Sequence, residues 1–140
     1  MEADIFLDTS YAVALASDED QNHAYAVELS LKLESSRMRL ITTWAILLEI
    51  GNAFSKRDKR ATGIELISSI LSDPCVQIVS LSDEILHAAL ALYQQRMDKD
   101  WGLIDCLSFV VMQRCGIKSA LTADYHFVQA GFNPLLPLAK

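Results

Sequence analysis

The sequence predicts an α/β protein with a central, mostly parallel sheet. Short β-rich segments alternate with longer helical segments along the 140 residues, and this alternation is typical of βαβ units. Asp8 and Asp124 each stand at or just past the carboxyl end of a predicted strand, where parallel sheets usually form their ligand crevice. The length suits a single domain over residues 1–140, because no repeat and no linker interrupts the pattern.

The first part of the chain predicts a strand, two helices and a second strand. Residues 3–7 (ADIFL) are apolar and predict a buried strand that ends at Asp8. Residues 9–17 predict a short helix, and residues 23–35 predict an amphipathic one. Residues 39–42 (RLIT) predict the second strand. The apolar face of the amphipathic helix is expected to comprise Ala24, Val27 and Leu31.

The middle of the chain predicts two helices and a third strand. Residues 43–55 form a strongly apolar segment, and we expect a helix with Thr42 or Thr43 as its N-cap. Residues 61–72 predict the next helix, which a following Asp-Pro pair ends. The apolar segment CVQIVSL at residues 75–81 predicts the third strand.

The last part of the chain predicts three more helices and two more strands. A helix begins after Ser82, its expected N-cap, and extends to about Met97. Residues 103–114 predict a helix that a glycine ends. Residues 119–122 predict a fourth strand, residues 125–130 one or two helical turns, and residues 132–138 a weak fifth strand.

The net charge excludes one class of protein, but the surroundings of individual acids indicate more about function. Twelve Lys and Arg against eighteen Asp and Glu give a net charge of −6, which excludes a polycation that coats nucleic acid. Most acids lie in polar segments such as SDEDQN. Four acids instead stand alone within long apolar segments: Asp8, Glu49, Asp105 and Asp124.

Isolated carboxylates in apolar surroundings need a compensating charge. Glu49 has no Lys or Arg within a helical turn or two on its inner face, and Asp105 lies between Ile104 and Cys106. Several such acids raise one another's pKa when they come together. A Mg²⁺ or Mn²⁺ ion, which prefers oxygen ligands, resolves both problems. Taken singly, each acid is also consistent with an exposed residue or a helix cap, as Asp105 would be for the helix over 103–114.

Small polar side chains accompany the four acids. Their hydroxyl and amide groups suit hydrogen bonds that orient carboxylates, although helix caps and bonds to helix carbonyls are the alternative. The residues concerned are Thr9, Ser10, Asn52, Ser108 and Thr122. The three histidines are scattered, with no metal-binding spacing, so neither a zinc site nor a catalytic histidine is expected.

Basic residues cluster directly after the Glu49 helix. Four of the twelve bases fall within five residues and are candidates for phosphate contacts, with a solvated loop or an inter-chain contact as the alternative. The cluster comprises Lys56, Arg57, Lys59 and Arg60, and two smaller candidates are Arg96 and Lys99.

Four ordered motifs make the chain resemble the PIN-domain family of metal-dependent nucleases. The motifs are FLDTS, LLEIGNAF, DKDWGLIDCLSFVVM and LTADYHFVQAGF, and they span residues 5–132. The resemblance implies a three-layer α/β/α domain with a parallel sheet of about five strands. It also implies an endoribonuclease that uses one or two Mg²⁺ or Mn²⁺ ions to activate water, with Asp8, Glu49, Asp105 and Asp124 as metal-binding and catalytic residues.

The last two motifs are similar to the toxin half of VapBC toxin–antitoxin pairs. That likeness implies an RNA substrate, a small antitoxin that blocks the site and a homodimer. No apolar segment reaches the ~18–20 residues of a membrane span, and three cysteines without zinc or thioredoxin spacing are typical of reduced thiols in a cytoplasmic protein. A solitary processing nuclease, an inactive PIN-fold interaction module and a phospho-acceptor receiver domain remain as alternatives. The subgroup has Ser-Leu-Thr before its third acid where this chain has Gly-Leu-Ile, so Ile104 offers Asp105 no hydrogen bond. Asp98 matches the motif and is a candidate for the rim of the metal pocket, with a solvated loop acid as the favoured alternative.

Overall fold

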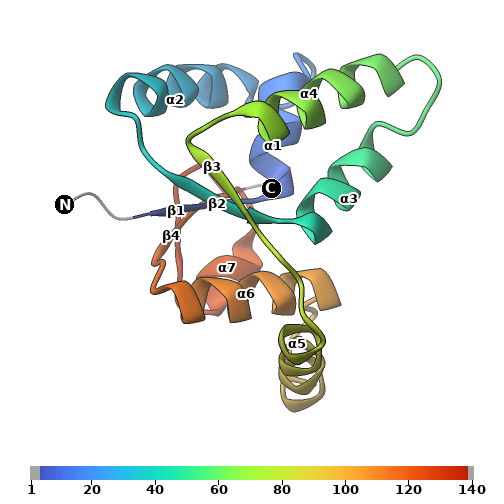
Figure 1. The fold of residues 1–140 in the computed structure, drawn as a ribbon, viewed down its shortest axis with the longest axis vertical. Coiled ribbons are helices and arrows are strands. Elements are labelled where there is room, and N and C mark those ends of the chain that lie inside the picture. The colour runs from blue at the N-terminus through green and yellow to red at the C-terminus, as the bar shows by residue number, and fades with distance from the viewer. Residues whose placement is uncertain (1–3, 139–140) are drawn as a thin grey trace.

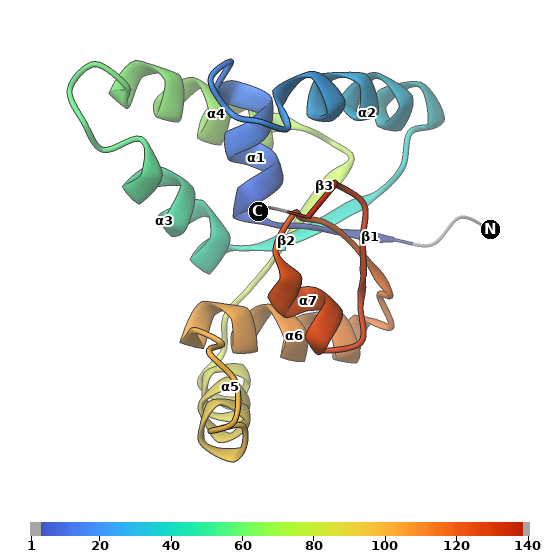
Figure 2. The same ribbon diagram turned by 180° about the vertical axis from the view of Figure 1, so that it is seen from behind.

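The fold is a three-layer α/β/α arrangement around a parallel sheet. The structure is a computed structural model that describes residues 4–138. Helices α1 to α4 lie on one side of the sheet and α5 to α7 on the other (Figures 1 and 2). The five strands are β1 Ile5–Leu7, β2 Leu40–Thr43, β3 Val76–Val79, β4 Ser119–Leu121 and β5 Asn133–Pro134. The predicted fold class is therefore confirmed.

The helices of the described residues follow the predicted order. They are α1 Thr9–Ala16, α2 His23–Ser36, α3 Trp44–Ala53, α4 Arg60–Ser72, α5 Asp83–Gln95, α6 Leu103–Cys115 and α7 Tyr125–Gln129. Within residues 4–138, no helix combines the length and apolar character that a bilayer crossing requires.

The strand order β3-β2-β1-β4-β5 places β1 at the centre of the sheet. The chain moves from β1 outward through β2 to β3 and then crosses back to add β4 on the other side of β1. Such a reversal creates a switch point where a crevice opens beyond the carboxyl ends of the strands. The order also differs from the 2-1-3-4-5 order of receiver domains, which argues against that alternative.

The core is built from apolar side chains on both faces of the central strands. Phe6 of β1 pairs in register with Ile41 of β2 and Ala120 of β4, and all three are almost fully buried. On the α6–α7 side, the Phe109 ring packs edge-on against Phe127, with ring centroids 5.0 Å apart. This packing fixes the strands and helices whose ends carry the polar residues.

Local capping explains where several helices begin. Thr43 caps α3, since its hydroxyl accepts a hydrogen bond from the Ile46 amide, and Ser82 caps α5 by the same contact to Ile85. Of the two threonines expected as caps, Thr42 has another role: its buried Oγ1 donates to the Leu7 carbonyl at 2.9 Å. That bond ties the ends of β1 and β2 together.

Two local expectations were wrong. In α2 the buried face is Ala26, with Leu29 and Leu33 packed against the core, whereas Val27 and Leu31 are 37% and 62% exposed. The helix rests on α1, and this tertiary contact selects a face that the apolar pattern alone does not. The fifth strand shrinks from residues 132–138 to Asn133–Pro134. The Leu135 N–H still donates to the Ala120 carbonyl, but the Leu136 N–H shifts to the Thr122 carbonyl and Pro137 has no N–H to continue the ladder.

The packing of α3 against α4 generates a stability prediction. A Cβ added at Gly63 would lie 2.6 Å from Phe54 Cβ, so Gly63→Ala should lower the free energy of unfolding by about 1–3 kcal/mol. Gly51→Ala is the matched control, because its Cβ would meet only Ile67 Cδ1 at 3.7 Å. The control should raise stability by about 0.5–1 kcal/mol through helix propensity. Urea denaturation measures both, and equal effects would contradict the close contact at Gly63.

Candidate metal centre

A cavity of about 500 Å³ opens at the carboxyl ends of β1 and β4. All four acids that the sequence singles out line it, together with two more acids, and no Lys or Arg is among its described lining residues. The six acids are Asp8, Asp20, Glu49, Asp100, Asp105 and Asp124. The cavity is thus a concentration of negative charge at the switch point of the sheet.

Asp8 is the most deeply buried of these acids. It follows β1 directly and is 6% exposed. Its Oδ2 accepts hydrogen bonds from Thr122 Oγ1 at 2.7 Å and from Ser10 Oγ at 3.0 Å. Burial raises the pKa of Asp8 from 3.8 to about 6, the hydroxyl bonds lower it, and the charge of Glu49 raises it further. The Asp8 carboxylate therefore sits in a pocket that disfavours its charge.

Glu49 approaches from α3, which begins immediately after β2. Its side chain is half-buried, and its Oε1 accepts a hydrogen bond from Thr9 Oγ1 in the first turn of α1. Because Thr42 joins the ends of β1 and β2, α1 and α3 start from neighbouring points of the sheet. Glu49 and Asp8 consequently face the same cavity.

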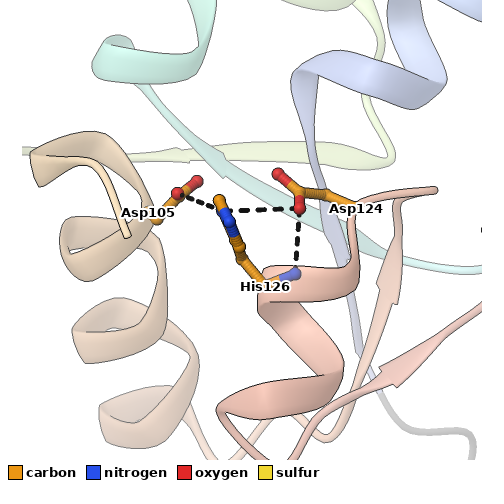
Figure 3. A group of neighbouring side chains, drawn as sticks. All are labelled: Asp105, Asp124 and His126. Atoms are coloured by element: carbon orange, nitrogen blue, oxygen red, sulfur yellow. Dashed lines mark hydrogen bonds and ion pairs between the residues drawn. The ribbon is translucent and has the colours of Figure 1, made fainter. Parts of the chain in front are cut away.

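Asp105 and Asp124 come from the starts of α6 and α7 and meet at His126 (Figure 3). The His126 Nδ1 lies 2.9 Å from Asp105 Oδ2 and 3.5 Å from Asp124 Oδ1. Asp124 also caps α7, accepting the His126 backbone N–H at 2.9 Å. Asp105 accepts the Gly102 backbone N–H at 3.0 Å. Gly102 and His126 therefore provide the hydrogen bonds to Asp105 that Ile104 cannot provide.

The expected companions of the acids divide into two groups. Thr9, Ser10 and Thr122 contact Glu49 or Asp8, as described above. Asn52 is exposed on α3 and does not line the cavity. Ser108 is 1% exposed, and its hydroxyl finds no hydrogen-bond partner within residues 4–138. Neither Asn52 nor Ser108 is brought to the carboxylates.

Asp98 lies outside the cavity, at the surface. It forms a two-bond ion pair with Arg96, at 3.0 and 3.1 Å, and lies 3.8 Å from Lys99. The hydrogen bonds from Arg96 hold the pKa of Asp98 at about 2. The nearby acid that lines the cavity is Asp100. Asp98 is thus a solvated loop acid, the favoured alternative, and Asp100 takes the place at the cavity that the motif suggested for Asp98.

Sequence reasoning missed Asp20, Asp100 and His126. Asp20 belongs to a polar segment, where an acid gives no sign of isolation. His126 carried a usable signal, because it stands two residues after an acid at the start of a short helix. A histidine in that position can turn back toward the capping carboxylate, as it does here.

Of the basic cluster at residues 56–60, Lys56, Arg57 and Lys59 lie in the loop between α3 and α4, and Arg60 begins α4. None of the four bases lines the cavity. However, Lys59 Nζ lies 4.0 Å from Glu19 Oε2, and Glu19 precedes the residues 20–22 that form one wall of the cavity. Arg96 and Lys99 lie on the opposite loop, where Asp98 engages both charges and the Arg96 guanidinium stacks 5.0 Å above the Trp101 ring.

The donor set fits a hard or borderline divalent cation. One ligand atom each from Asp105, Asp124 and His126 lies within 4.8 Å of the others. The cavity adds the carboxylates of Asp8 and Glu49 and supplies no Lys or Arg from its described lining to neutralise them. Carboxylate oxygens are the ligands that Mg²⁺ and Mn²⁺ prefer.

The fold and this cavity define an α/β/α protein with an acidic site at the switch point of its sheet. The PIN-domain family profile matches residues 5–133, and the chain belongs to the PIN-domain family. It is similar to the 23S rRNA-specific endonuclease VapC20 of Mycobacterium tuberculosis, with 26% identity over 133 residues, 95% of this chain and 98% of the relative.

Solved structures agree with this assignment of the fold. The crystal structure of Mycobacterium tuberculosis VapC20, described as a sarcin–ricin loop cleaving toxin, matches with a TM-score of 0.83 and 24% identity over 95% of this chain and 99% of that one. VapBC2 from Rickettsia felis, bound to a promoter DNA fragment, matches with a TM-score of 0.68 and 15% identity, over 94% and 96% of the chains. FitAcB from Neisseria gonorrhoeae matches with a TM-score of 0.63 and 15% identity, over 93% of this chain and 95% of that one.

The raised pKa of Asp8 generates a pH-dependent stability prediction. Asp8 titrates near 3.8 when unfolded and about 6 when folded, so its stabilising contribution is complete below the lower value and is lost as pH rises through the upper one. In EDTA at about pH 8, Asp8→Asn should therefore raise the free energy of unfolding by about 1–3 kcal/mol. The gain should shrink toward zero near about pH 4.

Thermal and urea unfolding across this pH range measure the effect. The control is Asp73→Asn, an exposed turn residue whose Oδ1 accepts the Cys75 backbone N–H, a bond that asparagine preserves. The control should be neutral at every pH. An Asp8→Asn effect that does not depend on pH would contradict burial of a carboxylate.

Proposed function

We propose that the protein is a Mg²⁺- or Mn²⁺-dependent endoribonuclease. One observation carries the proposal: four carboxylates from separate apolar segments converge in one cavity that has no described Lys or Arg in its lining. Membership of the PIN-domain family supports it, as does the likeness to a 23S rRNA-specific endonuclease.

The proposed roles of the residues follow from their contacts. Asp8, Glu49 and Asp105 hold the ion or ions, directly or through water, and Asp124 holds a second ion or orients the attacking water. Ser10 and Thr122 keep Asp8 aimed into the cavity through their bonds to its Oδ2. Thr9 does the same for Glu49.

The metal supplies Lewis acidity, which lowers the pKa of water and stabilises the leaving oxygen of a phosphodiester. The chain itself must then position the RNA backbone beside the carboxylates. The exposed bases of the 56–60 loop are well placed to do this, because Lys59 contacts the loop that walls the cavity. Phosphate contacts there offset the repulsion between RNA and the acidic pocket.

We further propose that the protein is the toxin of a toxin–antitoxin pair and forms a homodimer. One solved neighbour is a VapBC assembly, and VapBC is the name of such pairs. A cavity that gathers six carboxylates offers a binding place for an Arg or Lys of an antitoxin. Large apolar side chains remain exposed on α3 and α5, among them Leu48 at 65% and Tyr93 at 47%, and are available to a second copy.

The nuclease proposal is tested by cleavage of RNA. Wild type should cleave in Mg²⁺ or Mn²⁺ and lose activity in EDTA, and Asp8→Asn should lower the rate at least about 100-fold, since a direct ligand costs no less than an outer-shell partner. Large-subunit ribosomal RNA is the first substrate to test, because it is the target named for the relative. Asp73→Asn should cleave normally. Cleavage that survives EDTA or Asp8→Asn would overturn the proposal.

The basic loop generates a separate prediction about substrate binding. The double variant Lys56→Ala, Arg57→Ala should raise KM with little change in kcat, and should reduce the slope of log KM against log salt by about one to two units. Lys32→Ala is the control, because Lys32 is an exposed base on α2, 3.8 Å from Glu28. The control should leave KM unchanged. If the double variant also leaves KM unchanged, the loop makes no phosphate contact.

A further inference from the structure

His126 lies between two of the carboxylates of the cavity. Its Nδ1 is 2.9 Å from Asp105 Oδ2 and 3.5 Å from Asp124 Oδ1, and Figure 3 shows the ring edge directed into the space between them. An octahedral ion with bonds of about 2.1 Å places neighbouring ligand atoms about 3 Å apart. The Nδ1–Asp105 distance therefore matches the spacing of adjacent ligands, and one ligand atom from each of the three side chains lies within 4.8 Å of the others.

The backbone holds this arrangement in place. Asp124 caps α7 and accepts the His126 amide at 2.9 Å, which fixes the two residues relative to each other. Asp105 is held independently, in the first turn of α6, by the Gly102 amide at 3.0 Å. The side chains of His126 and Asp105 are 31% and 21% exposed. The cluster thus joins two separate helices and is largely shielded from solvent.

The chemistry of an imidazole differs from that of the surrounding carboxylates. Mg²⁺ strongly prefers oxygen ligands, whereas Mn²⁺ and later first-row ions accept imidazole nitrogen as well. A site of carboxylates alone gives little basis for choosing between Mg²⁺ and Mn²⁺. A nitrogen ligand adds binding energy for Mn²⁺ that Mg²⁺ does not gain to the same extent.

We propose that His126 is a metal ligand through Nδ1 and makes the site prefer Mn²⁺ over Mg²⁺. The proposal rests on the metal-dependent function given above and adds a nitrogen donor to its carboxylates. Coordination requires the lone pair of Nδ1, so the ring proton resides on Nε2 when the ion is bound. The present contact of Nδ1 with Asp105 is then exchanged for a shared contact with the ion.

A purely structural role for His126 makes a different prediction. If the ring served only to orient Asp105 through the 2.9 Å contact, its loss would weaken Mg²⁺ and Mn²⁺ to a similar degree. No nitrogen would then be bonded to the ion. Metal selectivity and direct detection of nitrogen therefore separate the two roles.

Pulsed electron paramagnetic resonance of the Mn²⁺-loaded protein tests the proposal without RNA. Wild type should show ¹⁴N modulation from a bonded imidazole, and His126→Gln should lose it. By calorimetric titration, His126→Gln should weaken Mn²⁺ about 10- to 100-fold and Mg²⁺ no more than about 3-fold. The control is His87→Gln, an exposed residue of α5, which should match wild type in both measurements.

Several outcomes decide the matter. Mn²⁺ bound to wild type without ¹⁴N modulation would overturn the role of His126 and leave the nuclease proposal intact. Equal weakening of both ions in His126→Gln would do the same. If neither Mn²⁺ nor Mg²⁺ binds to wild type, the metal-dependent function is overturned together with this inference. The wild-type spectrum needs no variant, so a folding defect in His126→Gln cannot obscure the result.

Discussion

Repulsion among the carboxylates gathered at one edge of the sheet governs the chemistry of the site. Six acids line one cavity, and its described lining contains no Lys or Arg to balance them. Burial raises the pKa of Asp8 to about 6, and the charge of Glu49 adds to this rise. The side chains that contact these carboxylates are neutral donors. The hydroxyl of Thr9 donates to Glu49, and the hydroxyls of Ser10 and Thr122 donate to Asp8. Hydroxyls orient carboxylates without neutralising them, so a place for a cation remains.

The parallel topology explains why acids far apart in sequence meet there. β1 and β4 are neighbours, so the residues that follow them, Asp8 and Asp124, open onto the same crevice. Glu49 arrives on α3, whose preceding strand is tied to β1 by the bond from Thr42 to the Leu7 carbonyl. Asp105 lies in the first turn of α6, where the helix dipole favours a negative charge. The sheet order gathers the acids, and local donors keep each one in position.

Most of the fold and the four central acids could be predicted from the sequence, because both depend on patterns that extend along the chain. Strand and helix order follow from apolar periodicity, and Asp8, Glu49, Asp105 and Asp124 are conspicuous as lone charges in apolar segments. The inward face of α2 could not be predicted, since contact with α1 decides it. Asp20, Asp100 and His126 were not predicted either, because they join the site through the geometry of loops and helix starts, which apolar periodicity does not indicate.

If the converged carboxylates hold a divalent cation, anomalous diffraction should locate it. Crystals grown with saturating Mn²⁺ would be measured near the manganese absorption edge, and an anomalous difference map would locate the ion. We expect a strong peak inside the cavity, within about 2.0–2.5 Å of carboxylate oxygens of Asp8 and Asp105. A map with no peak in the cavity, or with peaks only elsewhere on the protein, would contradict this expectation.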